Sequence, residues 1–335
     1  MSGFQSKVFK ALFLCLVVIV SQPVAADKLP PELAGEIPFP SGQIAFIRNG
    51  DIWVMDALGT NQRPVCQVSN AEGRLSWSPD NERIVFTRSG LVDIKGPDLT
   101  GGRHKVYDLF MCYLDSAEAG NTKFWTRLTT DLGSRGPEWN IDGRTIIFWR
   151  DMNANRISSR YPNYQLCVTD PAGDSVILLR HDWQQAGRQF LVTPSMNSRG
   201  DIAFVFFDEL QPGGLVVLAR NDISVPLDTI RAMAVEYKGY VAPAWSPDGQ
   251  WLASVCDNPG DSGLCIVGPD LKTGYLVTPP PESAYIDRQS PSFSPDSKWI
   301  TFSTSDGSIW MCDITGNGLR RLTSPGPDHS PCWSH

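Results

Sequence analysis

The stretch FSPDSKWITF, residues 293–302, decides the fold of this chain. It joins an aromatic residue, through Ser-Pro-Asp, to an Ile-x-Phe triplet. Pro presets φ for a tight turn and Asp bonds to the backbone just ahead of it. The aromatic and β-branched residues on either side favour short strands. The stretch therefore predicts a β-hairpin.

The same pattern recurs along the chain, which indicates a repeat fold. Ile-x-Phe triplets begin at Ile44, Ile84, Ile146, Ile202 and Ile300, with residues 252–254 as a degenerate sixth. Aromatic residues stand seven positions before most of them, at Trp77, Trp139, Trp245 and Phe293. A third strand is expected at 52–56, 109–115, 164–170, 215–218, 264–267 and 309–313, followed each time by a shorter fourth.

Six units of four short strands, each about 50 residues long, predict an all-β fold: a six-bladed β-propeller of four-stranded antiparallel blades. Each unit is expected to begin as a tight hairpin. One unit is divided between the two ends, because residues 330–334 repeat the start of the motif and residues 43–56 supply strands that no motif precedes. Pairing of the N- and C-terminal strands is expected to close the ring.

The N-terminus has the order of a secretory signal peptide. Lys7 and Lys10 precede an apolar run, which is followed by small residues up to Ala26. We expect cleavage after Ala26, a Pro-rich extended arm over 27–41 and the propeller over 42–335. Removal of residues 1–26 would change the formal charge from −7 to −9. Without a basic run or a later apolar segment of sufficient length, we expect a periplasmic or secreted protein that binds no nucleic acid and does not span a membrane.

WSPDG at 245–249, DIWVMD at 51–56 and RRLT at 320–323 together resemble the WD40-like repeat of the TolB propeller family. The resemblance covers almost all of residues 42–335. It implies the propeller fold and a non-catalytic, protein-interaction or ligand-binding role in the bacterial cell envelope. Only residues 27–41 lie between the predicted signal peptide and the first strand, so we expect a stand-alone propeller that lacks the N-terminal α/β domain of TolB. An accessory role in translocation of the Tol-Pal type is a minor alternative.

Long connections concentrate on one face of the predicted ring, where binding residues usually lie. We expect this face to bind a partner, because cations gather near the channel mouth and could attract an acidic peptide or envelope protein. Alternatively, these side chains only keep the loops solvated. The predicted binding residues are Arg74, Arg135, Tyr240, Arg288 and His329 before the inner strands, and Arg150 and Arg156 in the insertions.

No catalytic motif emerges, and we expect a monomer without enzymatic activity or cofactor. The segment GDSG at 260–263 is interpreted as a hairpin turn. A propeller enzyme, a lyase or hydrolase acting on glycans at the channel mouth, is the alternative, with Glu72, Asp328 and His329 as the residues of interest. No linear motif predicts a metal site, although Ca²⁺ in the propeller channel stays open.

Seven cysteines would remain after cleavage, so at least one thiol cannot pair within the chain. Cys112, Cys167 and Cys265 occupy the repeat position of Trp53 and Trp310, which indicates buried apolar residues. Cys256 and Cys265 lie on adjacent predicted strands, and a disulfide between them is expected if they are opposite each other.

Overall fold

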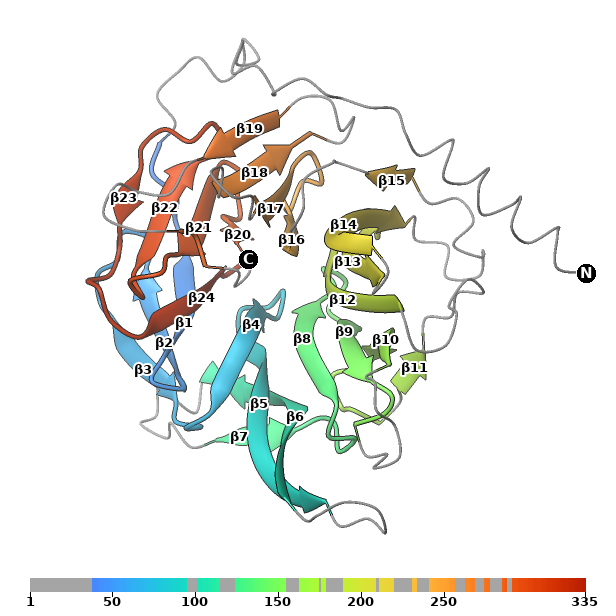
Figure 1. Ribbon diagram of the computed structural model, residues 1–335. Coiled ribbons are helices and arrows are strands. Elements are labelled where there is room, and N and C mark those ends of the chain that lie inside the picture. The colour runs from blue at the N-terminus through green and yellow to red at the C-terminus, as the bar shows by residue number, and fades with distance from the viewer. Residues whose placement is uncertain are drawn as a thin grey trace, which may run out of the picture.

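The computed structural model describes residues 38–94, 102–114, 124–154, 163–174, 176–178, 189–208, 211–219, 231–233, 241–256, 263–268, 274–277, 285–287 and 291–335. The predicted signal peptide, its cleavage site and most of the predicted arm lie outside these ranges. The described strands form six four-stranded antiparallel sheets, which stand around a central axis (Figure 1).

In each sheet, the first strand of the series given below lies nearest the central axis and the last lies at the outer edge. The first two sheets contain β24 (Asp328–Trp333), β1 (Gln43–Arg48), β2 (Asp51–Asp56) and β3 (Arg63–Cys66), then β4 (Ala71–Trp77), β5 (Arg83–Ile94), β6 (Gly102–Tyr113) and β7 (Trp125–Arg127). The next contains β8 (Ser134–Trp139), β9 (Ile146–Asp151), β10 (Tyr164–Thr169) and β11 (Val176–Leu178).

The other three sheets follow the same order. They contain β12 (Gln189–Met196), β13 (Ile202–Asp208), β14 (Gln211–Ala219) and β15 (Arg231–Met233); β16 (Val241–Trp245), β17 (Leu252–Cys256), β18 (Gly263–Val267) and β19 (Gly274–Val277); and β20 (Ser292–Phe293), β21 (Trp299–Ser303), β22 (Ile309–Asp313) and β23 (Arg320–Arg321).

The expectation that each unit begins as a tight hairpin holds for five sheets and needs correction for the one that the sequence divides between the two ends. Five sheets consist of strands that follow one another in the chain, whereas the remaining sheet, β24-β1-β2-β3, takes its inner strand from the other end. No turn can join β24 to β1, since they are the last and first strands of the described chain. Their antiparallel pairing replaces the turn, with Ile44 opposite Trp333 and Arg48 opposite Asp328.

Hydrogen bonds within each Ser-Pro-Asp turn fix its shape. In the β16–β17 turn, the Ser246 hydroxyl donates to Asp248 at 2.6 Å, and the same oxygen accepts the Trp251 N–H at 2.9 Å. Gly249 has φ of +67°, a left-handed conformation that costs glycine little. The motif residues therefore fix the turn locally, which explains why the hairpins are readable in the sequence.

Aromatic and β-branched residues of the repeat fill the space between the sheets. The Phe residues of the Ile-x-Phe triplets, such as Phe86 and Phe302, are completely buried. The inner-strand tryptophans pack between neighbouring sheets, and the Trp77 indole donates to the Cys332 carbonyl of the next sheet at 3.0 Å. Apolar burial between the blades is the main force that stabilises the ring.

Two details differ from the sequence-based expectations. One of the long connections predicted for the loop-rich face, the insertion over residues 88–107, is largely strand, because β5 and β6 continue as a two-stranded ribbon to the pair Ile94 and Gly102. In addition, Cys256 lies opposite Gly263 while Cys265 lies opposite Ser254, so the two cysteines do not face each other. The expectation of a disulfide depended on the two cysteines being opposite each other, and the register does not place them so.

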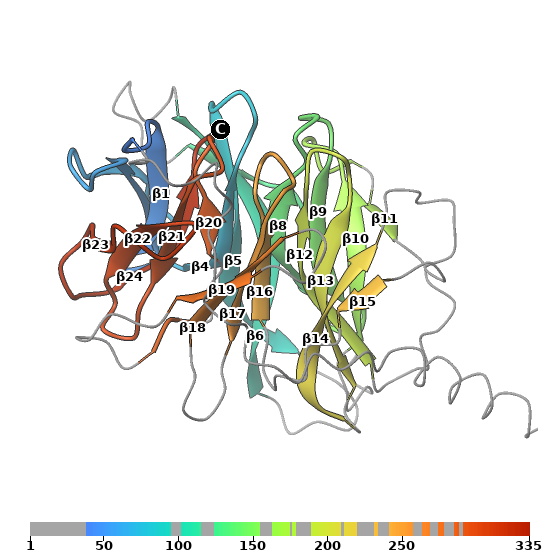
Figure 2. The ribbon, with the colours of Figure 1, turned by 90° about the horizontal axis from the view of Figure 1, so that it is seen from above.

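The two faces of the ring carry different connections. The β4–β5 and β8–β9 turns lie on the side of the C-terminus, whereas β13 and β14 project to the opposite side (Figure 2). We name these the turn face and the loop face. The predicted partner site belongs to the loop face.

Candidate functional site

The inner strands surround the channel. Several of these strands contain a β-bulge, which sets the direction of the side chains beside it. In β4, β8, β12 and β16 the register with the neighbouring strand shifts just before the aromatic position. The bulges coincide with left-handed residues, among them Gly136 at φ +58°, Thr193 at φ +49° and Ala242 at φ +53°. A bulge adds one residue to one strand and re-aims the side chains beside it.

In several blades, the residue before the aromatic position joins its blade to the next one. The Ser76 hydroxyl accepts the Trp139 N–H at 2.9 Å, and the Ser195 hydroxyl accepts the Trp245 N–H at 3.0 Å. At the ring closure the Ser292 hydroxyl accepts the Trp333 N–H at 3.0 Å. These bonds run around the channel wall and hold the blades in register with one another.

Arg74 occupies the centre of the channel. Its side chain is 7% exposed and forms an ion pair with Glu138 of the next blade. It also donates to the backbone carbonyls of Pro194 and Pro243, on strands β12 and β16. Arg74 therefore connects four blades, and it lies within β4 rather than before it as the sequence suggested.

Glu138 is the acceptor at the centre of this network. Its carboxylate also accepts the Met196 N–H at 2.7 Å and the Ser195 hydroxyl at 2.9 Å. Burial raises the pKa of the Glu138 carboxyl, while Arg74 and the two hydrogen bonds oppose that shift. Glu138 was not predicted as a site residue from the sequence, although it stands at the repeat position that Ser76 and Ser195 occupy in other blades.

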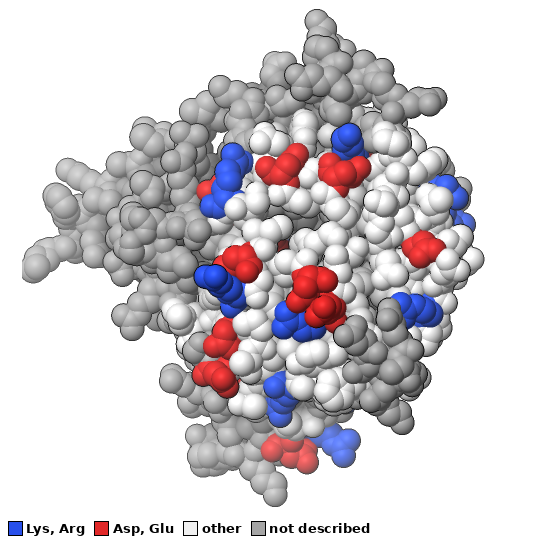
Figure 3. All heavy atoms as spheres, turned by 180° about the vertical axis from the view of Figure 1, so that it is seen from behind, with Lys and Arg blue, Asp and Glu red and all other residues white. Residues whose placement is uncertain are grey.

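Beyond Arg74 the channel opens toward the turn face as a small cavity. The cavity measures about 100 Å³ and is lined by the inner-strand aromatics, together with Arg74 and Glu138. Figure 3 shows this face, with acidic and basic side chains around a central hollow. Sites for small molecules usually measure about 300–1,000 Å³, so this cavity is too small for a peptide or a sugar.

Arg135 belongs to an aromatic cluster between β6, β8 and β9. Its guanidinium carbon lies 3.4 Å from the centre of the Tyr107 ring and 5.0 Å from that of Trp149. Trp149 in turn meets Tyr164 edge to face, with ring centres 4.9 Å apart. Among the described residues the Arg135 Nε atom has no hydrogen-bond partner. Cation–π contacts therefore orient this guanidinium without neutralising it.

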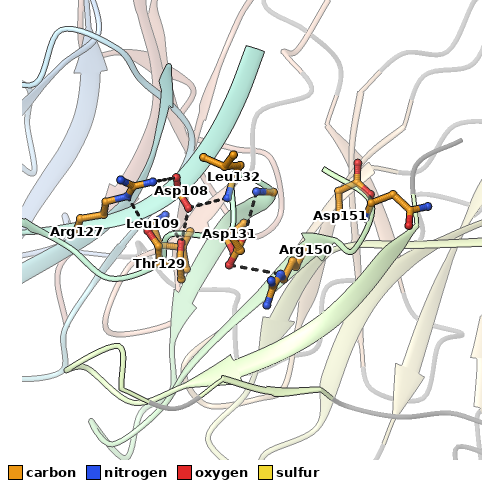
Figure 4. Close-up of polar contacts among 11 residues, drawn as sticks. Asp108, Leu109, Arg127, Thr129, Asp131, Leu132, Arg150 and Asp151 are labelled. Atoms are coloured by element: carbon orange, nitrogen blue, oxygen red, sulfur yellow. Dashed lines mark hydrogen bonds and ion pairs between the residues drawn. The ribbon is translucent and has the colours of Figure 1, made fainter. Parts of the chain in front are cut away.

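Arg150 forms an ion pair with Asp131. Its Nε lies 3.4 Å from a carboxylate oxygen of Asp131, near a second network in which Asp108 binds Arg127 at 2.6 Å and Thr129 at 3.1 Å (Figure 4). The Leu132 N–H also donates to Asp108, at 3.1 Å. The sequence predicted a ligand-binding cation at Arg150, and the structure places it in this internal network.

His329 lies at a polar hollow of about 470 Å³ between the first and last sheets, which Asp287, Asp306 and Tyr285 also line. Asp328 in the same wall is 2% exposed and receives two 2.7 Å hydrogen bonds from Arg48. Burial lowers the pKa of His329, although Asp287, Asp328 and Glu72 act in the opposite direction.

Glu72, the third residue of interest for an enzyme, pairs with Lys105 at 2.7 Å. Tyr240, Arg288 and Arg156 lie outside the described residues. Within the described ranges, no three His, Cys, Asp or Glu side chains are grouped so that they could hold a metal ion. In those same ranges, no helix has the length and apolar character to cross a membrane.

The architecture defines the chain as a β-propeller closed by pairing of its terminal strands. Models of protein families and curated proteins give no match to the sequence. Among solved structures, TolB from Acinetobacter baumannii aligns with a TM-score of 0.66 at 17% identity, over 90% of this chain and 69% of that chain. A putative TolB from Agrobacterium tumefaciens gives 0.57 at 14% identity, over 85% and 89%. An oligogalacturonate lyase in complex with manganese gives 0.51 at 15% identity, over 81% and 74%.

The chain is therefore a TolB-like propeller in its fold, and the predicted resemblance is confirmed at that level. Identities this low show a common architecture alone. The same architecture serves a lyase and TolB, so function has to be argued from the site.

Proposed function

We propose that this protein is a non-catalytic propeller of the bacterial cell envelope, which binds an acidic segment of a partner protein on its loop face. The observation that carries the proposal is the ribbon formed by residues 90–94 of β5 and 102–106 of β6. Figure 1 shows β5 and β6 running past the edge of the ring. A two-stranded arm of this kind offers a partner surface that the blade itself does not need for its core.

The charge of the ribbon is predominantly basic. Arg103, His104 and Lys105 are exposed on β6, and the one carboxylate within these two segments is Asp93, opposite Arg103. Leu91 on the facing strand is 62% exposed and adds an apolar contact. Such a surface suits a segment that combines acidic side chains with an apolar one.

The base of the ribbon leads directly to Arg135. Tyr107, which stacks on Arg135, follows the basic residues of β6, and the Lys105 ammonium lies 5.3 Å from the same ring. A cation that is held in place before binding loses little side-chain entropy when a carboxylate arrives. Arg135 is thus the inner end of a basic track that begins at Arg103.

Titration of the mature protein with a fluorescent peptide of alternating Glu and Leu tests the proposal. We expect binding that weakens as salt increases, and a loss of affinity of about tenfold or more when Arg103 and Lys105 are both replaced by Glu. Arg144→Glu, an exposed change at a turn of the other face, is the matched control and should bind like the wild type. Salt-independent binding, or an equal loss in the control, would contradict the proposal.

The enzyme alternative rests on the hollow beside His329, because its volume is in the range of a ligand site and carboxylates line it. The lyase among the structural neighbours makes acidic oligosaccharides the first substrates to try. Product formation from oligogalacturonate that disappears in His329→Ala would favour this alternative. The ion pair between Asp328 and Arg48 instead favours a structural role for the Asp328 carboxylate.

The envelope location within the proposal depends on the predicted signal peptide over residues 1–26 and on the TolB-like fold. Expression of the full chain with a C-terminal tag, followed by fractionation and N-terminal sequencing, tests it. A mature N-terminus at Asp27 in the periplasm or medium is the expected result. Retention of Met1 in the cytoplasmic fraction would contradict it.

A further inference from the structure

The ribbon of β5 and β6 has strand edges that the propeller does not use. β5 pairs with β4 only up to Arg88, and β6 pairs with β7 only from Phe110 onward. Outward from the pair of Ser89 and Tyr107, the described residues of the two strands pair only with each other. An edge of this kind can pair with another chain, and proteins usually shorten or cover it.

The register of the ribbon determines which backbone groups point outward. In an antiparallel pair, hydrogen-bonded and non-hydrogen-bonded residue pairs alternate, and the backbone groups of the second kind point away from the partner strand. Tyr107 is of the second kind, because its N–H donates to the Leu132 carbonyl outside the ribbon, at 3.0 Å. The register is unbroken, so Lys105 and Arg103 are of this kind as well. Among the described residues, their outward N–H and C=O groups have no backbone partner.

The side chains of these same residues carry the positive charge of the ribbon. Because side chains alternate across a strand, those of Arg103, Lys105 and Tyr107 lie on one face. Arg103 and Lys105 are both exposed. Lys105 binds Glu72 at 2.7 Å, but its side chain is 51% exposed and an ammonium has three donors. Both cations are therefore open to carboxylates of a strand that lies beside β6.

We propose that the acidic segment of the partner binds as an added antiparallel strand on the free edge of β6, with carboxylates at alternate positions opposite Arg103 and Lys105. This inference rests on the proposed function and specifies the conformation of the ligand. In strand addition, main-chain hydrogen bonds give affinity and alternate side chains give specificity. Opposite charges on directly facing residues stabilise such a pair. The added strand ends at Tyr107, whose N–H is already bonded.

A second copy of this chain fits the same edge less well. Antiparallel pairing of two β6 edges would bring Arg103 and Lys105 of one copy against the same cations of the other, and facing like charges destabilise a sheet. Size-exclusion chromatography without peptide should therefore give a monomer. A dimer that Lys105→Pro dissociates would assign the edge to a second copy and overturn the proposal.

Backbone methylation of the peptide of alternating Glu and Leu tests the binding mode. With the Glu side chains opposite Arg103 and Lys105, the N–H groups of the Glu residues point to β6 and those of the Leu residues point away. Methylation of the Glu nitrogens should weaken binding about tenfold or more, whereas methylation of the Leu nitrogens should change affinity by less than about twofold. Equal affinities of the two methylated peptides, or a larger loss with methylated Leu, would overturn the proposal.

The unmethylated peptide distinguishes this inference from the proposed function. If it does not bind the wild-type protein, the proposed function fails. If it binds and both methylated peptides bind equally well, only the added strand is refuted.

Proline substitution gives a second measurement. Lys105→Pro removes an outward N–H and leaves the hydrogen bonds between β5 and β6 to the neighbouring residues. It should bind the peptide about tenfold more weakly than Lys105→Ala, which loses the same ammonium but keeps the N–H. Asp93→Pro is the matched control, because the outward groups of Asp93 lie on the other edge, and it should bind like Asp93→Ala. Equal binding by Lys105→Pro and Lys105→Ala would contradict the added strand. If the proline variants fail to fold, the methylated peptides decide with the wild-type protein.

Discussion

Replacement of Arg74 by Met should destabilise the whole ring, although Arg74 is a single residue of one inner strand. The change keeps much of the side-chain volume but removes the charge. Glu138, whose side chain is 17% exposed, then keeps a carboxylate without its cation, and the carbonyls of Pro194 and Pro243 lose their donor. Removing one partner of a buried ion pair costs about 3–5 kcal/mol.

A double-mutant cycle separates the ion pair from the loss of packing. Glu138→Gln preserves an acceptor for the Met196 N–H, so the double variant lacks both charges while the blade junction is kept. We expect the double variant to be more stable than the sum of the single costs implies, by about 2 kcal/mol, because neither charge is left buried alone. Urea unfolding monitored by tryptophan fluorescence gives the four free energies of unfolding.

The exposed pair of Arg83 and Asp80 provides the control. Its side chains are 25% and 39% exposed, and an ion pair with this access to water contributes about 0–1 kcal/mol. Arg83→Met should therefore be nearly neutral. If Arg74→Met lowered the free energy of unfolding by less than about 1 kcal/mol, or if the cycle were strictly additive, the ion pair of Arg74 and Glu138 would not be what holds the channel strands together.

Three further predictions concern the ring and its ends. Asp328→Asn should cost about 2–3 kcal/mol in urea unfolding, less than a fully buried pair, because the side chain of Arg48 is 24% exposed; an unchanged midpoint would contradict the closure. Ala244→Ser should stabilise by about 0.5–1.5 kcal/mol, because a Ser at this repeat position accepts the N–H of the next blade, here that of Phe293; a lower melting temperature would oppose this. Burial lowers the pKa of His329. The stability that the neutral imidazole contributes is therefore complete above the ordinary His pKa of 6.5 and is lost as the pH falls below that value. His329→Gln should lose less stability than the wild type between about pH 7.5 and about pH 5, and equal losses would contradict this prediction.

The hairpins and the ring closure were predictable because their causes are local or repeated. Ser, Pro and Asp fix each turn within a few residues of sequence, and the divided repeat at 330–334 and 43–56 requires the two ends to pair. The third strand expected at 309–313 is β22 with the same bounds. Such signals need no knowledge of distant parts of the chain.

The channel was not predictable in the same way. Arg74 reaches carbonyls that are 120 and 169 positions away, and it does so because bulges re-aim the inner strands. A bulge shifts the side-chain alternation by one residue, so a simple repeat alignment put Arg74 before the strand and at the channel mouth. The position before each aromatic did carry a signal, since Ser76, Ser195 and Ser292 share it and all accept a bond from the next blade.

The internal pairs also change how the charge of the loop face should be interpreted. The sequence suggested a ring of cations around the channel mouth, but Arg74 and Arg150 are already paired with Glu138 and Asp131. A guanidinium that is satisfied within the fold attracts a partner only weakly, because binding would first have to break its existing bonds. Arg135 differs, since its contacts are aromatic faces that leave its charge in place. Substitution of Arg74 or Arg150 should therefore act mainly on stability, whereas substitution of Arg135 should act on affinity while the free energy of unfolding changes little.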